Sequence, residues 1–226
     1  MSEGFRLSIT YEIRGRLAYL SHLETVEAMR RIVRRAQLPY AVSEGFSPHM
    51  KATFGPALPV GASGLDERFD VRLRDYVPAT EALERLQQAA PQHLMPVACR
   101  YVDVSAPAPD VALALSFWRA QFAGGDDARE CESALQAAFD ELLSVGFVEI
   151  VKRKRGKETR KRIMFDEKLA CPPAFSLEDG SVCMEFATRQ GPDGALRPDT
   201  FIDAGLAGCA QPPQLVSLVR TRLAEQ

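Results

Sequence analysis

The chain begins with the pattern of a strand, and the start signal of a helix follows it. This order limits the folds that the chain can adopt. Hydrophobic and polar residues alternate from Phe5 to Ile13, as on a strand with one buried face. Ser21 and Glu24 then have the spacing of a capping box, which begins a helix. Hydrophobic residues recur at spacings of three or four after it, and Pro39 ends the pattern. A strand must therefore lead directly into an amphipathic helix.

The rest of the N-terminal half continues this order. The pattern predicts further elements at 40–42 (extended), 50–54 (extended), 68–74 (strand), 78–90 (helix) and 94–102 (strand). Strand, helix, strand, strand, helix, strand is the order of the ferredoxin-like βαββαβ unit. We therefore predict an α+β protein in which residues 1–104 form one ferredoxin-like unit.

The pattern of the C-terminal half predicts a second, irregular ferredoxin-like unit over residues 110–226. A proline-rich linker at 105–109 precedes it. The expected elements are a strand at 111–122, a helix at 126–145, a basic hairpin at 148–165, a strand at 182–186, a helix at 197–206 and a C-terminal helix at 215–224. No residue-level repeat relates the halves, so the tandem depends on element order alone.

Composition excludes several classes of protein. The 226 residues are 46% hydrophobic and 26% charged, which is typical of a globular chain. No run of about 18 apolar residues is present, so we expect no membrane association and a cytoplasmic location. The five cysteines include no CxxC, which argues against a disulfide framework, a zinc site or an iron–sulfur cluster. Nucleotide-loop and hydrolase motifs are also missing, and we expect no cofactor.

Two histidines lie in the densest stretch of the chain, residues 20–61. His22 is in the first turn of the predicted helix, where the helix dipole disfavours imidazolium, and His49 follows Pro48 in a turn. Either histidine could serve as a general acid or base, or both could be ordinary capping and loop residues. A metal site would need carboxylates to converge on them, and we predict none.

The predicted helix also carries Arg30, Arg31, Arg34 and Arg35 near its end. Such a run is either a solvated face, with Glu27 pairing some of the arginines, or a contact for phosphate or carboxylate. Lys51 and the arginines of strand 68–74 could extend the same positive surface. The sequence leaves both interpretations open.

The strongest electrostatic signal is a run of eight cations with one acid, Glu158, among them. The cations are Lys152, Arg153, Lys154, Arg155, Lys157, Arg160, Lys161 and Arg162. Like charges so close together repel unless an anion relieves them, and nucleic-acid phosphate is a common partner. Aromatic residues are sparse here, so stacking on single-stranded bases is not indicated. An acidic protein surface and a merely solvated hairpin remain the alternatives.

The first half contains a series of short motifs: Leu20–Glu24 (LSHLE), Arg34–Ala36, Leu38–Pro39, Gly45–His49 (GFSPH), Leu58–Gly61 and Glu67–Asp70. With these motifs, and more loosely with Arg153–Lys157 and Leu196–Pro198, the chain resembles a domain family of unknown function called radical SAM-linked. Glu24 replaces the family's usual aspartate, and Met50 stands where proline is common. Members of that family occur alone or fused behind a cobalamin-binding radical SAM protein. The resemblance implies a radical SAM protein as partner and supplies no established activity.

We therefore expect an accessory, RNA-binding or substrate-positioning module that works with a radical SAM RNA-modifying enzyme. The eight hairpin cations would hold RNA rather than DNA, and a pocket or docking surface would comprise Ser21, His22, Glu24, Arg34, Arg35, Gly45, Phe46, Pro48, His49, Lys51, Glu67 and Asp70. One alternative is a metal-independent RNA-processing enzyme with His22 or His49 as general acid or base. The other is a protein-docking subunit without RNA binding.

Overall fold

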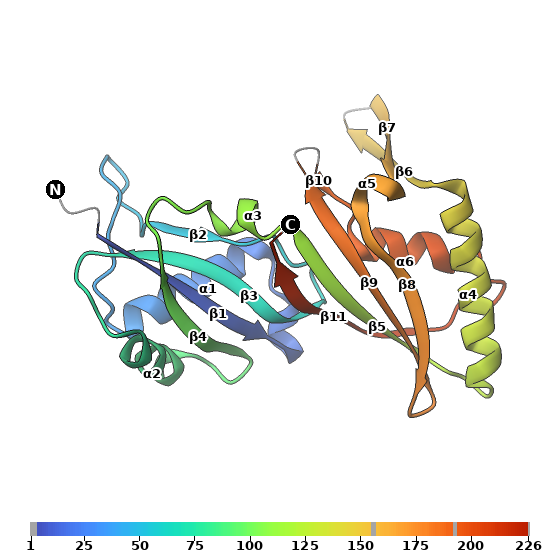
Figure 1. Ribbon diagram of the computed structural model, residues 1–226, viewed down its shortest axis with the longest axis horizontal. Coiled ribbons are helices and arrows are strands. Elements are labelled where there is room, and N and C mark those ends of the chain that lie inside the picture. Colours follow the sequence, from blue (N-terminus) through green and yellow to red (C-terminus); the bar gives the residue numbers. More distant parts are fainter. Residues whose placement is uncertain (1–3, 155–156, 192–193, 226) are drawn as a thin grey trace. The chain divides into compact units, whose positions relative to one another are not determined.

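The computed structural model describes residues 4–154, 157–191 and 194–225, without the side chains of residues 152–154 and 157. The chain forms two compact units (Figure 1). Unit 1 comprises Met1–Ala114 with Arg220–Gln226, and unit 2 comprises Leu115–Val219. No helix within the described ranges is long and apolar enough to cross a membrane.

Unit 1 is an antiparallel sheet with two main helices. Its elements are β1 (Phe5–Ile13), the short 3-10 helix η1 (Gly15–Tyr19), α1 (His22–Arg35), β2 (Ala52–Phe54), β3 (Ser63–Leu73), α2 (Ala79–Ala89), β4 (Leu94–Val102) and α3 (Pro109–Ala112). β1 lies between β3 and β4, and β2 pairs with β3. Without counting η1 and α3, this is the predicted order of strand, helix, strand, strand, helix, strand.

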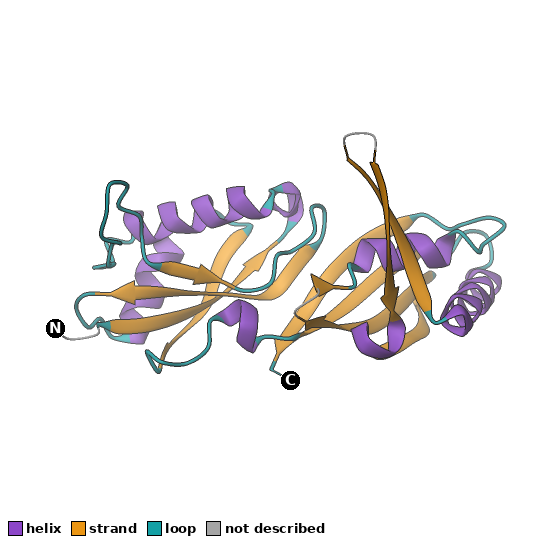
Figure 2. Ribbon diagram, turned by 90° about the horizontal axis from the view of Figure 1, so that it is seen from above, coloured by secondary structure: helices purple, strands orange, loops and turns teal. Residues whose placement is uncertain are grey.

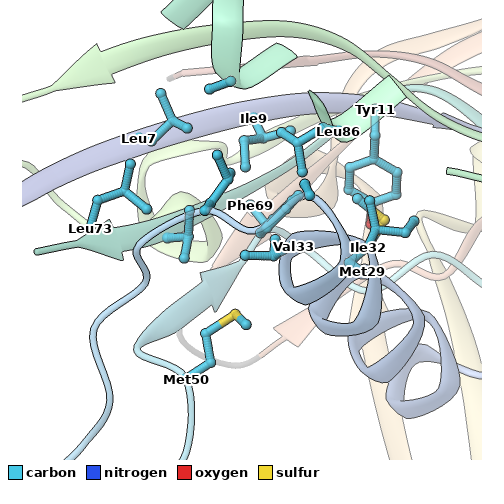
Figure 3. Packing of buried hydrophobic residues seen from close by; sticks show 14 of the residues in the cluster. Leu7, Ile9, Tyr11, Met29, Ile32, Val33, Met50, Phe69, Leu73 and Leu86 are labelled. Atoms are coloured by element: carbon cyan, nitrogen blue, oxygen red, sulfur yellow. The ribbon is translucent and has the colours of Figure 1, made fainter. Parts of the chain in front are cut away.

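One face of this sheet carries the hydrophobic core. Leu7, Ile9 and Phe69 are fully buried there, and they pack against Met29 and Val33 of α1 (Figure 3). The alternation that predicts β1 and β3 places every second residue on this face. The helices therefore cover the apolar side of the sheet.

The other face of the sheet is polar. Ser8 of β1 is the cross-strand partner of Asp70 on β3 and of Arg100 on β4, so the three residues share this face. α1 lies on the core side of the sheet and the short α3 on the opposite side (Figure 2).

Unit 2 has a different order of elements. They are β5 (Leu115–Ala123), α4 (Ala128–Val145), β6 (Phe147–Lys154), β7 (Lys157–Met164), α5 (Phe165–Lys168), β8 (Leu169–Glu178), β9 (Ser181–Gly191), β10 (Gly194–Ala195), α6 (Pro198–Leu206) and β11 (Leu215–Ala224). β9 pairs with β5, β8 and β10, all antiparallel. Phe139 of α4 and Phe201 of α6 are fully buried and pack edge to face.

The prediction of a mixed α+β chain is confirmed, and the tandem of ferredoxin-like units is not. In unit 2, β6 and β7 form a separate two-stranded sheet instead of joining the main one. β8, which the sequence analysis missed, takes a place beside β9. Its two prolines interrupt the strand pattern, and the pairing is correspondingly irregular near Cys171 and Ala174.

The predicted C-terminal helix is wrong, because Leu215–Ala224 forms strand β11. The segment LVSLVRTRLA fits both a helical and a strand period, so its pattern alone does not decide. β11 lies next to β3, and Arg220–Ala224 belongs to unit 1. Backbone hydrogen bonding to a strand more than 140 residues away in the sequence determines the outcome.

Candidate functional site

His22 begins helix α1 and lines a small cavity in unit 1. Ser21 is the N-cap, and it shares both hydrogen bonds of the predicted capping box with Glu24. Glu24 receives the Ser21 backbone N–H at 2.8 Å, so glutamate, which is longer than the aspartate usual in the resembling family, reaches back to the cap. The cap fixes the first turn and with it the half-buried ring of His22, which meets Phe54 edge to face at 6.3 Å.

Glu67 of β3 lines this cavity and forms an ion pair with Arg220 of β11. Both side chains are almost fully buried, and Arg220 Nε donates to Glu67 Oε1 at 2.8 Å. Arg220 also donates to the carbonyls of Pro56, at 2.7 Å, and Ala57, at 3.4 Å. The guanidinium therefore joins β11, β3 and the loop after β2.

The ion pair changes the protonation behaviour of its neighbours. Burial lowers the pKa of His22, the Arg220 guanidinium lowers it further, and Glu67 opposes the shift. The pKa of the Tyr11 hydroxyl is raised, mainly by burial and then by the Glu67 carboxylate. His22 is therefore neutral at pH 7, as the sequence predicts, but burial rather than the helix dipole is the main cause.

The cavity is too small for a nucleotide. Its volume is about 10 Å³, and Tyr11, His22, Thr25 and Glu67 are among the residues that line it. That is room for about one water molecule, held by several polar partners. A cavity of this size cannot enclose an RNA substrate.

His49 lies elsewhere, on an exposed loop between Val42 and Met50. Its Nδ1 is 2.8 Å from Ser43 Oγ, and its backbone N–H donates to the same oxygen at 3.1 Å. His49 is not among the residues that line the His22 cavity. At the tip of the loop, Phe46 is fully exposed, with Gly45 and Pro48 exposed beside it. The GFSPH motif therefore forms a surface loop with an apolar tip.

The arginines of α1 mostly share one acid. Glu27 lies 2.8 Å from Arg34, 3.8 Å from Arg31 and 4.0 Å from Arg30. Arg35, with Arg85 of α2, borders a separate, open hollow. Lys51 is exposed, and its backbone N–H and carbonyl form hydrogen bonds with Ala41 and Arg72. Of the residues predicted for this surface, only His22 and Glu67 line the cavity, and Ser21 and Glu24 cap the helix that carries His22. The residues that do not line it include His49, Arg34, Arg35 and Lys51.

Asp70, the last residue predicted for this surface, is on the polar face of the sheet. It forms a buried ion pair with Arg6, whose Nε donates to Asp70 Oδ2 at 2.7 Å. Arg6 is not predicted as a site residue. Its signal is the alternation in β1, which places Arg6 and Ser8 on the face opposite to buried Leu7 and Ile9. Glu67 and Asp70 therefore serve two different cavities.

The basic hairpin is the pair β6–β7, which extends away from the rest of unit 2 (Figure 2). The buried pair Val148 and Ile163 anchors its base. Of the predicted cations, Arg160, Lys161 and Arg162 are described and exposed. The side chains of Lys152, Arg153, Lys154 and Lys157, and all of Arg155, lie outside the described residues.

Acids and an aromatic ring orient the described hairpin arginines. Arg160 lies 3.3 Å from Glu149 and 2.9 Å from Glu158, and Arg162 lies 3.4 Å from Glu149. The Arg162 guanidinium also stands 4.6 Å from the centre of the Phe147 ring. All these arginines keep more than half of their side-chain surface exposed, so the contacts position them without removing them from solvent.

Metal ligation has no geometric basis in the described part of the chain. No group of three or more His, Cys, Asp or Glu side chains in residues 4–154, 157–191 and 194–225 could hold a metal ion. The described cysteines are all free thiols. Burial raises the pKa of Cys99 to about 12, which makes it a poor nucleophile.

Residues 6–198 match one family model, described as an uncharacterized protein conserved in bacteria (DUF2344). The chain belongs to the DUF2344 family. The match runs from β1 to the start of α6 and includes the LSHLE and GFSPH motifs. The predicted membership of a family of unknown function is thus confirmed, whereas the DUF2344 description names no radical SAM protein.

Comparison with other proteins adds little to the DUF2344 assignment. No curated protein matches the chain. One solved structure, titled "Crystal Structure of an Unknown Protein from Galdieria sulphuraria", is 12% identical over 82% of this chain and 80% of that chain. The TM-score is 0.27, and the likeness carries no argument about fold or function.

Arg220 is the main residue of the His22 site that sequence reasoning missed. It lies in β11, outside the matched residues 6–198. Its signal is an arginine inside an otherwise apolar segment, because a charge in such a segment is tolerated only with a buried partner. The mistaken helix assignment hid this signal, since a helix offers an arginine a solvent-exposed side.

Proposed function

We propose that this protein is an accessory module that binds RNA through the β6–β7 hairpin and positions it for a radical SAM RNA-modifying enzyme. The observation that carries the proposal is the hairpin itself, a separate two-stranded sheet with exposed Arg160, Lys161 and Arg162. Its sequence adds five more cations within residues 152–157. Such a concentration of charge favours a polyanion as partner.

The geometry of the described arginines supports phosphate binding in particular. Glu149 and Glu158 hold Arg160, and Phe147 supports Arg162, so both guanidinium groups are partly ordered before a ligand arrives. Ordered guanidinium groups lose less conformational entropy on binding, and their planar donors match phosphate oxygens. The contacts would position the RNA backbone without reading its bases.

The partner enzyme would contact unit 1 at the GFSPH loop. A fully exposed phenylalanine at the tip of an ordered loop is costly in water and is typical of a residue that another protein covers. The radical SAM identity of that partner comes from the resemblance of the LSHLE and GFSPH motifs alone. The polar cavity of His22 would then stabilise the scaffold that carries this loop.

RNA binding tests the proposal directly. A fluorescently labelled transfer RNA is titrated with the protein at several salt concentrations, and anisotropy gives the dissociation constant. Phosphate contacts release counterions, so the proposal expects the logarithm of affinity to fall linearly and steeply with the logarithm of salt concentration. Affinity that does not depend on salt, or no binding at low salt, contradicts the proposal.

A further inference from the structure

A second cavity lies on the polar face of the unit 1 sheet, apart from the hairpin and from His22. It has a volume of about 210 Å³, and its lining includes Arg6, Ser8, Arg68, Asp70 and Arg100. These residues come from β1, β3 and β4. The rest of the wall comes from the segment around α3 and from Glu225, a carboxylate that follows β11. Figure 2 shows α3 on this side of the sheet. The cavity therefore has rigid strands on one side and a short helix on the other.

One carboxylate oxygen of Asp70 has no hydrogen-bond partner among the described residues. Arg6 directs two of its nitrogens at Asp70 Oδ2, at 2.7 and 2.6 Å, and its remaining donors reach the carbonyls of Ala106, at 2.5 Å, and Pro107, at 2.7 Å. The other carboxylate oxygen, Asp70 Oδ1, is buried. A buried acceptor without a donor is costly, and because Asp70 is a lining residue of the cavity, its unpaired oxygen points to a ligand that donates to it.

Arg100 supplies a positive charge at the same cavity. Arg6 is neutralised by Asp70, and Arg68 contacts Asp66 at 3.2 Å. Arg100 is exposed and forms no ion pair with any residue in the described ranges. Its strand neighbour Ser8, which pairs with both Arg100 and Asp70, places the two charges on one face across a single strand. A ligand that contacts both Arg100 of β4 and Asp70 of β3 would therefore span β1, which lies between those two strands.

We propose that this cavity binds a small carboxylate that also carries an amino or hydroxyl group. The carboxylate would contact the Arg100 guanidinium, whose paired donors suit that geometry. The amino or hydroxyl group would donate to Asp70 Oδ1. The volume is below the range of drug-sized ligand pockets, which limits the ligand to the size of an amino acid or a hydroxy acid. This site is independent of RNA binding by the hairpin.

The test uses the full chain and a defined set of probes. The standard amino acids, lactate and malate are each added at millimolar concentration, and thermal unfolding is followed. A ligand that binds only the folded state raises the melting temperature in a saturable way. Calorimetric titration then gives the dissociation constant of each probe that does so. If no probe binds, the proposal is wrong.

Two variants and a control locate the binding. Arg100→Gln removes the proposed carboxylate contact. Because a charged hydrogen-bond partner is lost, the dissociation constant should rise at least tenfold. Ala112→Phe fills the cavity from α3 without changing a charge and should abolish binding. Arg14→Gln removes an exposed arginine outside the cavity and should bind as the parent protein does.

The melting temperatures of the unliganded variants show whether they fold. Arg100 is exposed and Ala112 is only half-buried, so neither substitution disturbs the core. Arg100→Gln that folds and binds a probe as tightly as the parent protein overturns the proposed contact. Equal weakening in Arg14→Gln would show a general charge effect and would overturn it as well.

Discussion

Arg220 and Glu67 form a buried ion pair although 153 residues separate them in the sequence. The pair joins β11 to β3, and two carbonyls of the loop after β2 take the remaining donors of the guanidinium. Such an arrangement satisfies both charges inside the protein. The fold depends on both partners, because removal of either one leaves the other charged, buried and without its counter-ion.

Arg220→Met should therefore lower the free energy of unfolding by about 3–5 kcal/mol, since Glu67 would lose its partner in a buried position. Urea denaturation of the two proteins measures the difference. The double variant Arg220→Met with Glu67→Met replaces the pair by apolar groups and should regain most of the loss. If the loss of unfolding free energy in the double variant equals the sum of the losses in the two single variants, the two side chains are not coupled.

His22 should make stability depend on pH. Its folded pKa is lowered by burial and by Arg220, so the unfolded state binds more protons than the native state as pH falls through about 6.5. Its contribution is therefore fully present above the unfolded pKa and is lost on acidification below it. Urea denaturation at about pH 7.5 and about pH 5.5 gives the free energy of unfolding at each pH. Between the two, the parent protein should lose more of this free energy than His22→Asn. His49→Asn, at an exposed loop site, serves as the control and should lose as much as the parent protein.

Gly64 should be required for the position of Glu67. A Cβ atom at residue 64 would stand 2.5 Å from Glu67 Oε1 and 2.6 Å from its Cγ, which is too close for contact. Gly64→Ala should displace the carboxylate and cost about 1–3 kcal/mol of unfolding free energy, as overpacked sites do. In a Glu67→Ala background the three nearest atoms, which all belong to the Glu67 side chain beyond Cβ, are gone, and the same substitution should cost much less. Equal costs in both backgrounds would contradict this account of the glycine.

Phe46→Ser should weaken association with the radical SAM partner without affecting stability. Phe46 is fully exposed, so its loss removes no internal packing. Co-purification from cells that express both proteins measures association, and Tyr19→Ser, at another exposed aromatic position, is the matched control. Undiminished co-purification of Phe46→Ser would exclude the loop as the docking site.

Local features of this fold are predictable from sequence, and distant pairings are not. The capping box of Ser21 and Glu24 involves residues three apart, and the structure confirms both hydrogen bonds. The alternation of Phe5–Ile13 likewise predicts β1, because every second side chain meets the same core. In contrast, LVSLVRTRLA fits two periods, and only pairing with β3 makes it strand β11.

The candidate sites follow the same rule. His22 and Glu67 are predicted as site residues and line one cavity, yet Arg220, which controls their electrostatics, is 153 residues from Glu67. Asp70 is predicted too, but its partner Arg6 and its neighbour Arg100 come from other strands, and only the register brings the three together. His49 is predicted as a candidate equal to His22, but it lies on an exposed loop and does not line that cavity.

The most direct test of the central claim compares RNA binding by two charge-matched variants. One carries Arg160→Gln, Lys161→Gln and Arg162→Gln on the hairpin, and the other carries Arg14→Gln, Arg74→Gln and Arg129→Gln at exposed sites elsewhere. Each loses three positive charges, so any effect of net charge is equal. The account predicts that only the hairpin variant binds labelled transfer RNA more weakly, by tenfold or more, with a salt dependence reduced by about three phosphate contacts. Equal affinity of the two variants would contradict it.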